Sequence, residues 1–235
     1  DRLDADGHIQ LPEFITSKAI RAIQEEGERK ETQAYYCVQK HNVYLRQVDS
    51  QYDAHHVRNR NIDSSKGCLT DDQVDADSPL RQLYQSPQFR NFLCFVLDQK
   101  ALYEYADSLA SINLHFAAEG QELGWHFDNS SFAITIMIRA PEAGGKFEYI
   151  NDMRDSASAD MNFSGVEKVL DGNEQGTEIE MDAGTLLLFR GRDAIHRVTP
   201  VTGKVPRMLA TFAYNGEPGI ALSESARMTF FGRLE

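Results

Sequence analysis

Cysteine and long apolar runs are both scarce in this sequence of 235 residues. Its three cysteines, Cys37, Cys68 and Cys94, are widely spaced and form no Cys-x-x-Cys pair. Such a set predicts neither a disulfide framework nor a structural zinc site, and it favours a reducing compartment. No stretch approaches the roughly 18 apolar residues of a membrane helix, and the first residues lack the blocks of a signal peptide. We therefore expect a cytoplasmic protein that does not cross a membrane.

Basic residues are also few, with 24 Lys and Arg against 36 Asp and Glu and a net charge of -12. Binding to a nucleic-acid backbone draws on clustered positive charge, so this balance argues against a nucleic-acid partner and favours a small-molecule substrate. The length suits one well-filled domain. We predict a single domain over residues 1–235, with helical support and a loop in 1–110 and a barrel core in 111–235. The oligomeric state stays open.

The first half of the chain predicts two helices separated by an irregular segment. Apolar residues at helical spacing favour a helix over about 17–28, after a short strand at 7–11. The polar stretch 52–77, rich in Asp, Asn, Ser and Gly, indicates a long loop. Ser86-Pro87 is typical of a helix start, and the apolar residues that follow predict a second helix to about residue 106.

The second half predicts short strands almost to the end. Phe132, Ile134, Ile136 and Ile138 alternate with other residues, which is the period of two expected of a strand with two different faces. The polar segment 152–176 is interpreted as a surface insertion. Further strands are expected at 147–149, 177–181, 185–190, 196–198 and 207–214. Helices followed by about eight short strands favour a mainly β fold with flanking helices, the double-stranded β-helix or jelly roll of cupins.

Three residues have the pattern of a metal site. On a strand, His126 and Asp128 point to the same face, so one strand can present an imidazole and a carboxylate to one metal. A distant histidine, His196, would complete a 2-His-1-carboxylate face, the ligand set of non-haem Fe(II). The adjacent His55 and His56 make a poor chelate, and His115 is interpreted as a core histidine without an identifiable partner.

The chain around His196 resembles the 2-oxoglutarate/Fe(II) dioxygenase superfamily. The matching motifs are Gly184-Thr185-Leu186-Leu187-Leu188-Phe189, then His196, Thr199-Pro200-Val201, Gly203 and Arg207, and the resemblance spans about 113–214. It implies Fe(II), 2-oxoglutarate and O2 as cofactor and co-substrates, with His126, Asp128 and His196 as the catalytic metal ligands. It further implies that Arg207 grips the distal carboxylate of 2-oxoglutarate. Many relatives have Ser where Leu209 stands, so another donor is needed, and Thr211 is our candidate.

Within that superfamily the chain is most similar to a group acting on free amino acids, which includes lysine halogenases and related hydroxylases. The similarity rests on 113–116, Gly120, 124–128 and 144–149. The halogenases have Gly where Asp128 stands, which opens an iron position for chloride, so the resemblance implies hydroxylation here. A free amino acid needs partners for its charges. Arg58 or Arg60 could bind its carboxylate, and Asn129 could contact its backbone or side chain.

Three alternatives remain open. Prolyl-type hydroxylases of peptides share the barrel motifs, and the same iron chemistry can end in desaturation or cyclisation of an amino acid. A cupin-like metal-binding module without oxygenase activity is the third alternative, because fold alone does not determine function. Arg207 discriminates against it, since a non-catalytic module has no need of a 2-oxoglutarate anchor there.

Overall fold

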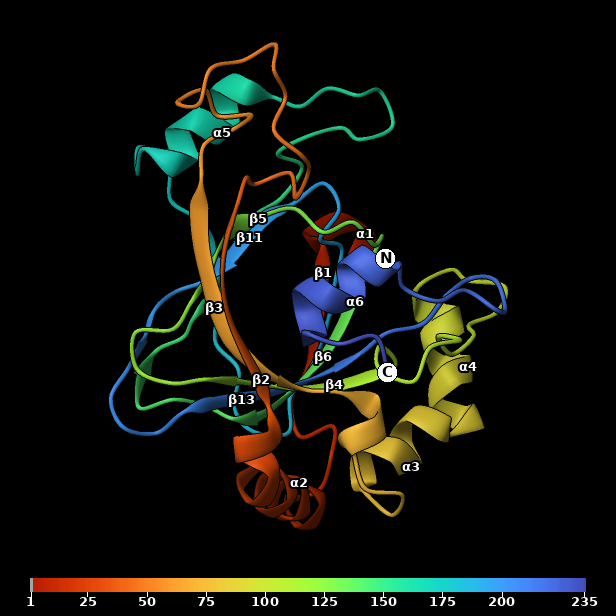
Figure 1. The fold of residues 1–235 in the computed structure, drawn as a ribbon. Coiled ribbons are helices and arrows are strands. Elements are labelled where there is room, and N and C mark those ends of the chain that lie inside the picture. Colours follow the sequence, from red (N-terminus) through yellow and green to blue (C-terminus); the bar gives the residue numbers. More distant parts are fainter. Residues whose placement is uncertain (1) are drawn as a thin grey trace.

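A long antiparallel sheet forms the centre of the computed structural model, which describes residues 2–235 (Figure 1). In spatial order its strands are β1 (His8–Leu11), β10 (Leu186–Phe189), β6 (Ala133–Arg139), β13 (Arg207–Phe212), β4 (Ile112–Ala117), β3 (Ile62–Leu69), β5 (Leu123–His126), β11 (Ile195–Val198), β8 (Phe147–Ile150) and β9 (Thr177–Ile179). Strand β2 (Tyr35–His41) also pairs with β3. The strands β7 (Ala143–Gly144) and β12 (Val201–Thr202) form a second, two-stranded sheet.

The long sheet curls so that its two halves share a core. Met137 and Leu209, from β6 and β13, pack in one buried cluster with Tyr149 and Ile179, from β8 and β9. Side chains of alternate residues therefore fill the space between the halves, as in other closed or half-closed sheets. The predicted mainly β jelly roll is confirmed.

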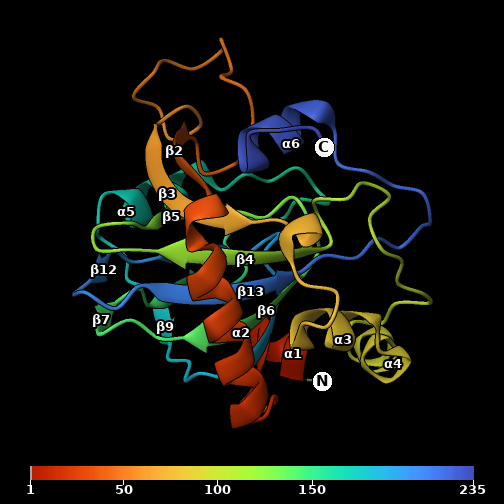
Figure 2. The same ribbon diagram turned by 60° about the horizontal axis from the view of Figure 1, so that its bottom comes forward.

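Three helices cover the outer face of the sheet: α2 (Ser17–Lys30), α3 (Pro79–Gln85) and α4 (Pro87–Val96). Figure 2 shows α2 lying across β4, β13 and β6. The Thr16 side chain caps α2 by accepting a hydrogen bond from the Ala19 amide. A Cβ at Gly27 would lie only 2.8 Å from Met208 Cε, so glycine lets α2 approach the sheet closely. Ile23 and Leu93 are buried in the resulting apolar cluster.

The described part of the chain has three further helices. They are α1 (Arg2–Asp6), α5 (Phe163–Leu170) and α6 (Glu224–Phe231), with short 3-10 turns at Glu31–Gln33 and Asp71–Gln73. The side chain of Asn162 caps α5 by accepting a hydrogen bond from the Gly165 amide. Within residues 2–235, none of the helices combines the length and the apolar character needed to cross a bilayer.

The first half of the chain is where the sequence-based expectations go wrong. The expected helix at 17–28 is confirmed, but the stretch 52–77 contains β3, and β2 was not predicted at all. The helix expected to reach residue 106 stops at Val96, because Asp98 takes a left-handed φ of 52° and the Gln99 amide bonds back to the Cys94 carbonyl. The expected surface insertion at 152–176 includes α5.

Candidate metal and co-substrate site

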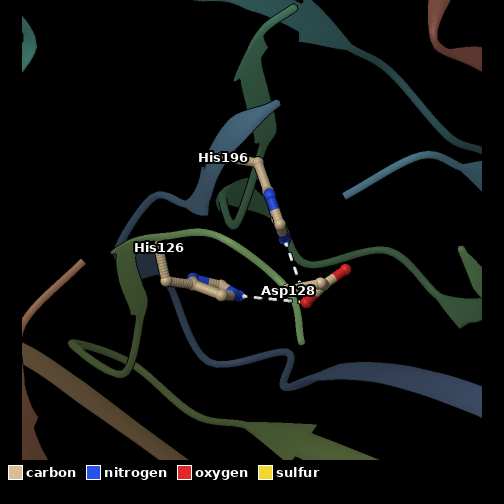
Figure 3. Close-up of side chains that lie close together, drawn as sticks. All are labelled: His126, Asp128 and His196. Carbon is tan, nitrogen blue, oxygen red and sulfur yellow. Dashed lines mark ion pairs between the residues drawn. The ribbon is translucent and has the colours of Figure 1, made fainter. Parts of the chain in front are cut away.

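His126, Asp128 and His196 converge at one point inside the curled sheet (Figure 3). His126 ends β5 and lies directly opposite His196 of β11 in the strand register. The Nε2 atoms of His126 and His196 lie 3.8 Å and 3.6 Å from Asp128 Oδ1. One ligand atom from each of the three residues falls within 4.8 Å of the others, a spacing that a single metal ion can bridge.

Backbone contacts orient both imidazole rings. His126 Nδ1 lies 2.8 Å from the Gly124 carbonyl oxygen, and His196 Nδ1 lies 3.0 Å from the Ala194 carbonyl oxygen. A carbonyl can only accept, so Nδ1 carries the proton in each ring and Nε2 keeps its lone pair. Metal-bound histidines commonly have such an outer partner, which fixes the tautomer and the ring direction. Both lone pairs point toward the space beside Asp128.

A glycine makes room for the carboxylate. Asp128 follows β5, and its amide donates to the Gly191 carbonyl oxygen at 2.9 Å. A Cβ at Gly191 would lie 2.0 Å from Asp128 Oδ2, so a side chain there would displace the ligand. The motifs around His196 do not predict this close approach of Gly191. Its contact with Asp128 follows from the approach of two loops distant in sequence.

The protonation states suit a cation. Burial and the neighbouring His196 lower the pKa of His126 well below its usual range. Burial alone would raise the pKa of Asp128, but His196 and His126 lower it below its ordinary value. At neutral pH Asp128 therefore offers a carboxylate and His126 a neutral imidazole. These are the forms that bind metal, and the donor set fits Fe(II).

Arg207 lies in the same interior without a partner. It begins β13, its residue is only 5% exposed, and its Nε makes no hydrogen bond. Burial lowers its pKa to about 10, so it stays charged at neutral pH. Among the side chains that the structure describes, no carboxylate pairs with it. A buried cation without a counter-ion is costly. This one therefore fits a ligand that brings its own carboxylate, such as 2-oxoglutarate.

Two cavities have a triad residue in their lining, and a third reaches Asn129, next to Asp128. The first, here called the β3 cavity, has Lys66, His126 and Phe230 in its wall. The second, the Asp128 cavity, measures about 520 Å³ and is lined by Asp128, Asn129, Arg192 and Thr211 among others. The third, the α6 cavity, measures about 530 Å³ and also reaches Asn129, under helix α6. His126 is therefore reached from the β3 cavity and Asp128 from the Asp128 cavity.

The other predicted site residues divide into two pairs. Asn129 and Thr211 both line the Asp128 cavity, next to a metal ligand. Arg58 and Arg60 are engaged elsewhere and line none of the three cavities: Arg58 Nη2 donates to the Gln47 carbonyl oxygen, and Arg60 forms a 2.5 Å ion pair with Asp171. The structure brings the first pair to the triad and the second pair to the loop before β3 and to the end of α5.

One contact of this interior was missed. Lys66 Nζ lies 3.2 Å from His115 Nδ1, so His115 has a partner that the sequence did not reveal. The two residues are on β3 and β4, which pair with Cys68 opposite His115. Because 52–77 was interpreted as a loop, nothing in the sequence placed Lys66 inside the barrel.

A family model described as Halogenase D matches residues 1–228. The chain belongs to the Halogenase D family. A comparison with curated protein sequences finds no significant match.

Solved structures share the fold of this Halogenase D family member at low sequence identity. HygX from Streptomyces hygroscopicus, with nickel, 2-oxoglutarate and hygromycin B bound, is 13% identical with a TM-score of 0.60, covering 97% of this chain and 93% of its own. The non-heme alpha ketoglutarate dependent carbocyclase SnoK from nogalamycin biosynthesis is 11% identical at 0.62, covering 94% and 86%. A Pseudomonas putida prolyl-4-hydroxylase is 15% identical at 0.55, covering 90% and 94%. Family and fold together place the chain among the 2-oxoglutarate-dependent non-haem iron oxygenases.

Proposed function

We propose that this protein is an Fe(II)/2-oxoglutarate-dependent hydroxylase of a small molecule, a free amino acid. One observation carries the proposal. The barrel interior contains both a 2-His-1-carboxylate triad and Arg207, a buried cation without a partner. When bound, iron and 2-oxoglutarate supply the oxidation of an unactivated C–H bond by O2, with release of succinate and CO2.

The chain's own residues bind and orient the reactants. His126, Asp128 and His196 would hold the metal from one side, which leaves the other side for reactants. Arg207 would bind the distal carboxylate of 2-oxoglutarate and so fix how the co-substrate lies. Thr211 lines the Asp128 cavity and is proposed as a further contact to co-substrate or substrate.

Asp128 favours hydroxylation over halogenation. The lysine halogenases that the sequence resembles have Gly at this position, which leaves a metal position for chloride. Here the Asp128 carboxylate would take that position on the metal. Membership of the Halogenase D family does not by itself assign halogenation, because chemistry is decided by the residues of the site.

The charges beside the triad favour an amino acid with an uncharged side chain. Arg192 lines the Asp128 cavity and Arg46 lines the α6 cavity, so either could pair with a substrate carboxylate. Among the described residues lining these two cavities, Asp128 is the only carboxylate. The α-ammonium group would therefore bind neutral oxygens, such as the side chain of Asn129. A second ammonium group, as in lysine, has no anionic partner there.

Arg58 and Arg60 are also proposed as substrate contacts, but after Arg192, Arg46 and Asn129. Each would first have to release its present partner, the Gln47 carbonyl oxygen or Asp171.

The test is a turnover assay with anaerobically purified protein, Fe(II), 2-oxoglutarate, chloride and a panel of neutral, acidic and basic free amino acids. After O2 is admitted, succinate and product mass are measured. We expect succinate stimulated by a neutral amino acid, with a gain of one oxygen atom in the product. A loss of two hydrogens would indicate desaturation or cyclisation instead. A gain of chlorine would contradict the reading of Asp128.

Arg207→Ala is the control for this assay. It should lose the substrate-stimulated succinate while still binding iron, because the triad is untouched. If wild type and Arg207→Ala gave the same background with every amino acid, the free-amino-acid proposal would fail. Proline-containing peptides would then be tested, and a negative result there would leave the non-catalytic metal-binding module.

A further inference from the structure

The interior near Arg207 contains a second cation, the half-buried Lys66. Strand parity places it there: Cys37 of β2 lies opposite Lys66, and Cys68 of β3 lies opposite His115 of β4, which lies opposite Leu209 of β13. Since side chains two residues apart share a face, Lys66 shares the inner face with Cys68, and so with His115 and Arg207. The 3.2 Å contact between Lys66 Nζ and His115 Nδ1 agrees with this register.

Lys66 has no anionic partner among the described residues. His115 is its hydrogen-bond acceptor and is neutral, because burial and the charge of Lys66 lower its pKa well below the usual range. The nearby thiols do not supply an anion either. Burial raises the pKa of Cys37, and it raises that of Cys68 to about 12. A carboxylate whose charge acts on Lys66 is that of Asp128, which belongs to the metal triad.

Two cations, the buried Arg207 and the half-buried Lys66, therefore face one interior in which the described residues supply no free carboxylate. Burial lowers the pKa of Lys66, and the charges of Arg207 and Asp128 both act on it, so the ammonium group lies within electrostatic range of the anchor and of the triad. Lys66 also lines the β3 cavity together with His126. A dianionic ligand that reaches from the metal toward Arg207 would neutralise both cations.

The strand that carries Arg207 offers no second donor directly beside Arg207. Leu209 has no polar atom. Thr211 is four residues from Arg207, about 13 Å along a strand, and it lines the Asp128 cavity. Lys66 instead comes from a neighbouring strand, with an ammonium group that donates three hydrogen bonds, one of which His115 can accept.

We propose that Lys66, held in place by His115, is the second cationic contact for the distal carboxylate of 2-oxoglutarate beside Arg207. This inference rests on the proposed function, because it assumes that 2-oxoglutarate is the co-substrate. Lys66 would act as a binding residue and His115 as a positioning residue.

Calorimetric binding at pH 7 to the anaerobic Fe(II)-loaded protein tests it with two ligands. One is 2-oxoglutarate, and the other is 2-oxopentanoate, which keeps the keto acid and replaces the distal carboxylate by a methyl group. Lys66→Gln should weaken 2-oxoglutarate binding about 10- to 100-fold, the usual worth of a hydrogen bond to a charged group. Binding of 2-oxopentanoate should change less than about 3-fold, because it lacks the carboxylate that Lys66 would meet.

Matched variants separate the contact from general damage. Lys66→Arg keeps the charge and should lose less 2-oxoglutarate affinity than Lys66→Gln. Lys168→Gln removes an exposed lysine of α5 and should change neither affinity. If Lys66→Gln does not fold, Lys66→Met removes the charge at similar length and should show the same selectivity.

Three outcomes are distinguishable. A loss confined to 2-oxoglutarate supports the contact. Equal losses for both ligands, or no loss, overturn it while the proposed function stands. If the wild-type protein holds iron but binds neither keto acid, the proposed function is wrong, and so is the inference.

Discussion

The two faces of strands β4 and β13 are both buried, yet their chemistry is opposite. Leu114 and Met208 point to the outer face and pack against α2 in the large apolar cluster. Their neighbours in sequence, His115 and Arg207, point inward beside Lys66. The outer face gains its stability from apolar burial. The inner face buries cations, a cost that a bound anion can offset. Alternation along one strand thus separates folding from ligand binding.

The largest effect is expected on the inner face, from Arg207→Gln. The affinity of the Fe(II)-loaded protein for 2-oxoglutarate should fall by about 100-fold or more, because a charge-assisted, potentially bidentate contact is lost. The free energy of unfolding of the metal-free protein should stay equal or rise, because a buried charge without a partner is removed. Calorimetry and urea unfolding measure the two quantities. A large loss of stability without a loss of affinity would reverse the assignment of the inner face.

Adjacent residues of β4 give the sharpest contrast. Leu114→Ala should lower the free energy of unfolding by about 2–5 kcal/mol, because it opens a cavity in the apolar cluster, and should leave 2-oxoglutarate affinity unchanged. His115→Leu should do the opposite, with about a tenfold loss of affinity as Lys66 loses its acceptor. The pair is compared by urea unfolding and calorimetry. Parallel changes in both variants would mean that the two faces are not separate.

Binding of 2-oxoglutarate should weaken as the pH rises through the lowered pKa of Lys66. A lysine whose folded pKa is lowered loses its proton at a lower pH than usual, so Lys66 loses the charge that attracts a carboxylate. His115 is already neutral, the pKa values of Cys37 and Cys68 are raised, and Arg207 keeps its proton with a pKa of about 10.

This pH effect is measured as the ratio of the affinities for 2-oxoglutarate and 2-oxopentanoate, which cancels changes at the iron and at Asp128. The ratio should fall by no more than the factor that Lys66→Gln costs at pH 7. Lys66→Arg should keep the ratio flat over the same range, since arginine stays protonated. A ratio that falls equally in both proteins would assign the effect to another group.

The smallest effect is expected from Gly27→Ala on the outer face. Alanine is favoured over glycine in a helix by about 1 kcal/mol, but its Cβ would lie 2.8 Å from Met208 Cε and 3.0 Å from Leu114 Cδ2. Overpacking of about 1–3 kcal/mol should outweigh that gain. Urea unfolding should show a net loss of stability. Glu25→Ala, on the exposed side of the same helix, should change stability by less than about 0.5 kcal/mol.

The metal triad could be predicted from the sequence because its information is local. His126 and Asp128 are two residues apart on one extended segment, and the turn motifs around His196 and Arg207 mark the same barrel. Lys66 could not be found in this way. Its contact with His115 joins positions 49 residues apart and depends on the pairing of β3 with β4.

A loop was expected where the structure has β3 because the side chains that line its cavity are polar. Ser64 and Lys66 make the strand look polar, and polar stretches are read as loops. A strand that lines a ligand cavity is polar on its inner face, so the usual alternation of apolar and polar faces does not reveal it. Alternation of residues correctly predicted β6, because Ile134, Ile136 and Ile138 all face the apolar cluster.

The most direct test of the account is an anaerobic titration of the Fe(II)-loaded wild-type protein with 2-oxoglutarate, followed by visible absorption. A keto acid that chelates iron held by His126, Asp128 and His196 produces a metal-to-ligand charge-transfer band. We predict that this band appears and saturates at one equivalent, and that Arg207→Gln needs a far higher concentration to reach it. Iron bound without any such band, at any concentration of 2-oxoglutarate, would contradict the account.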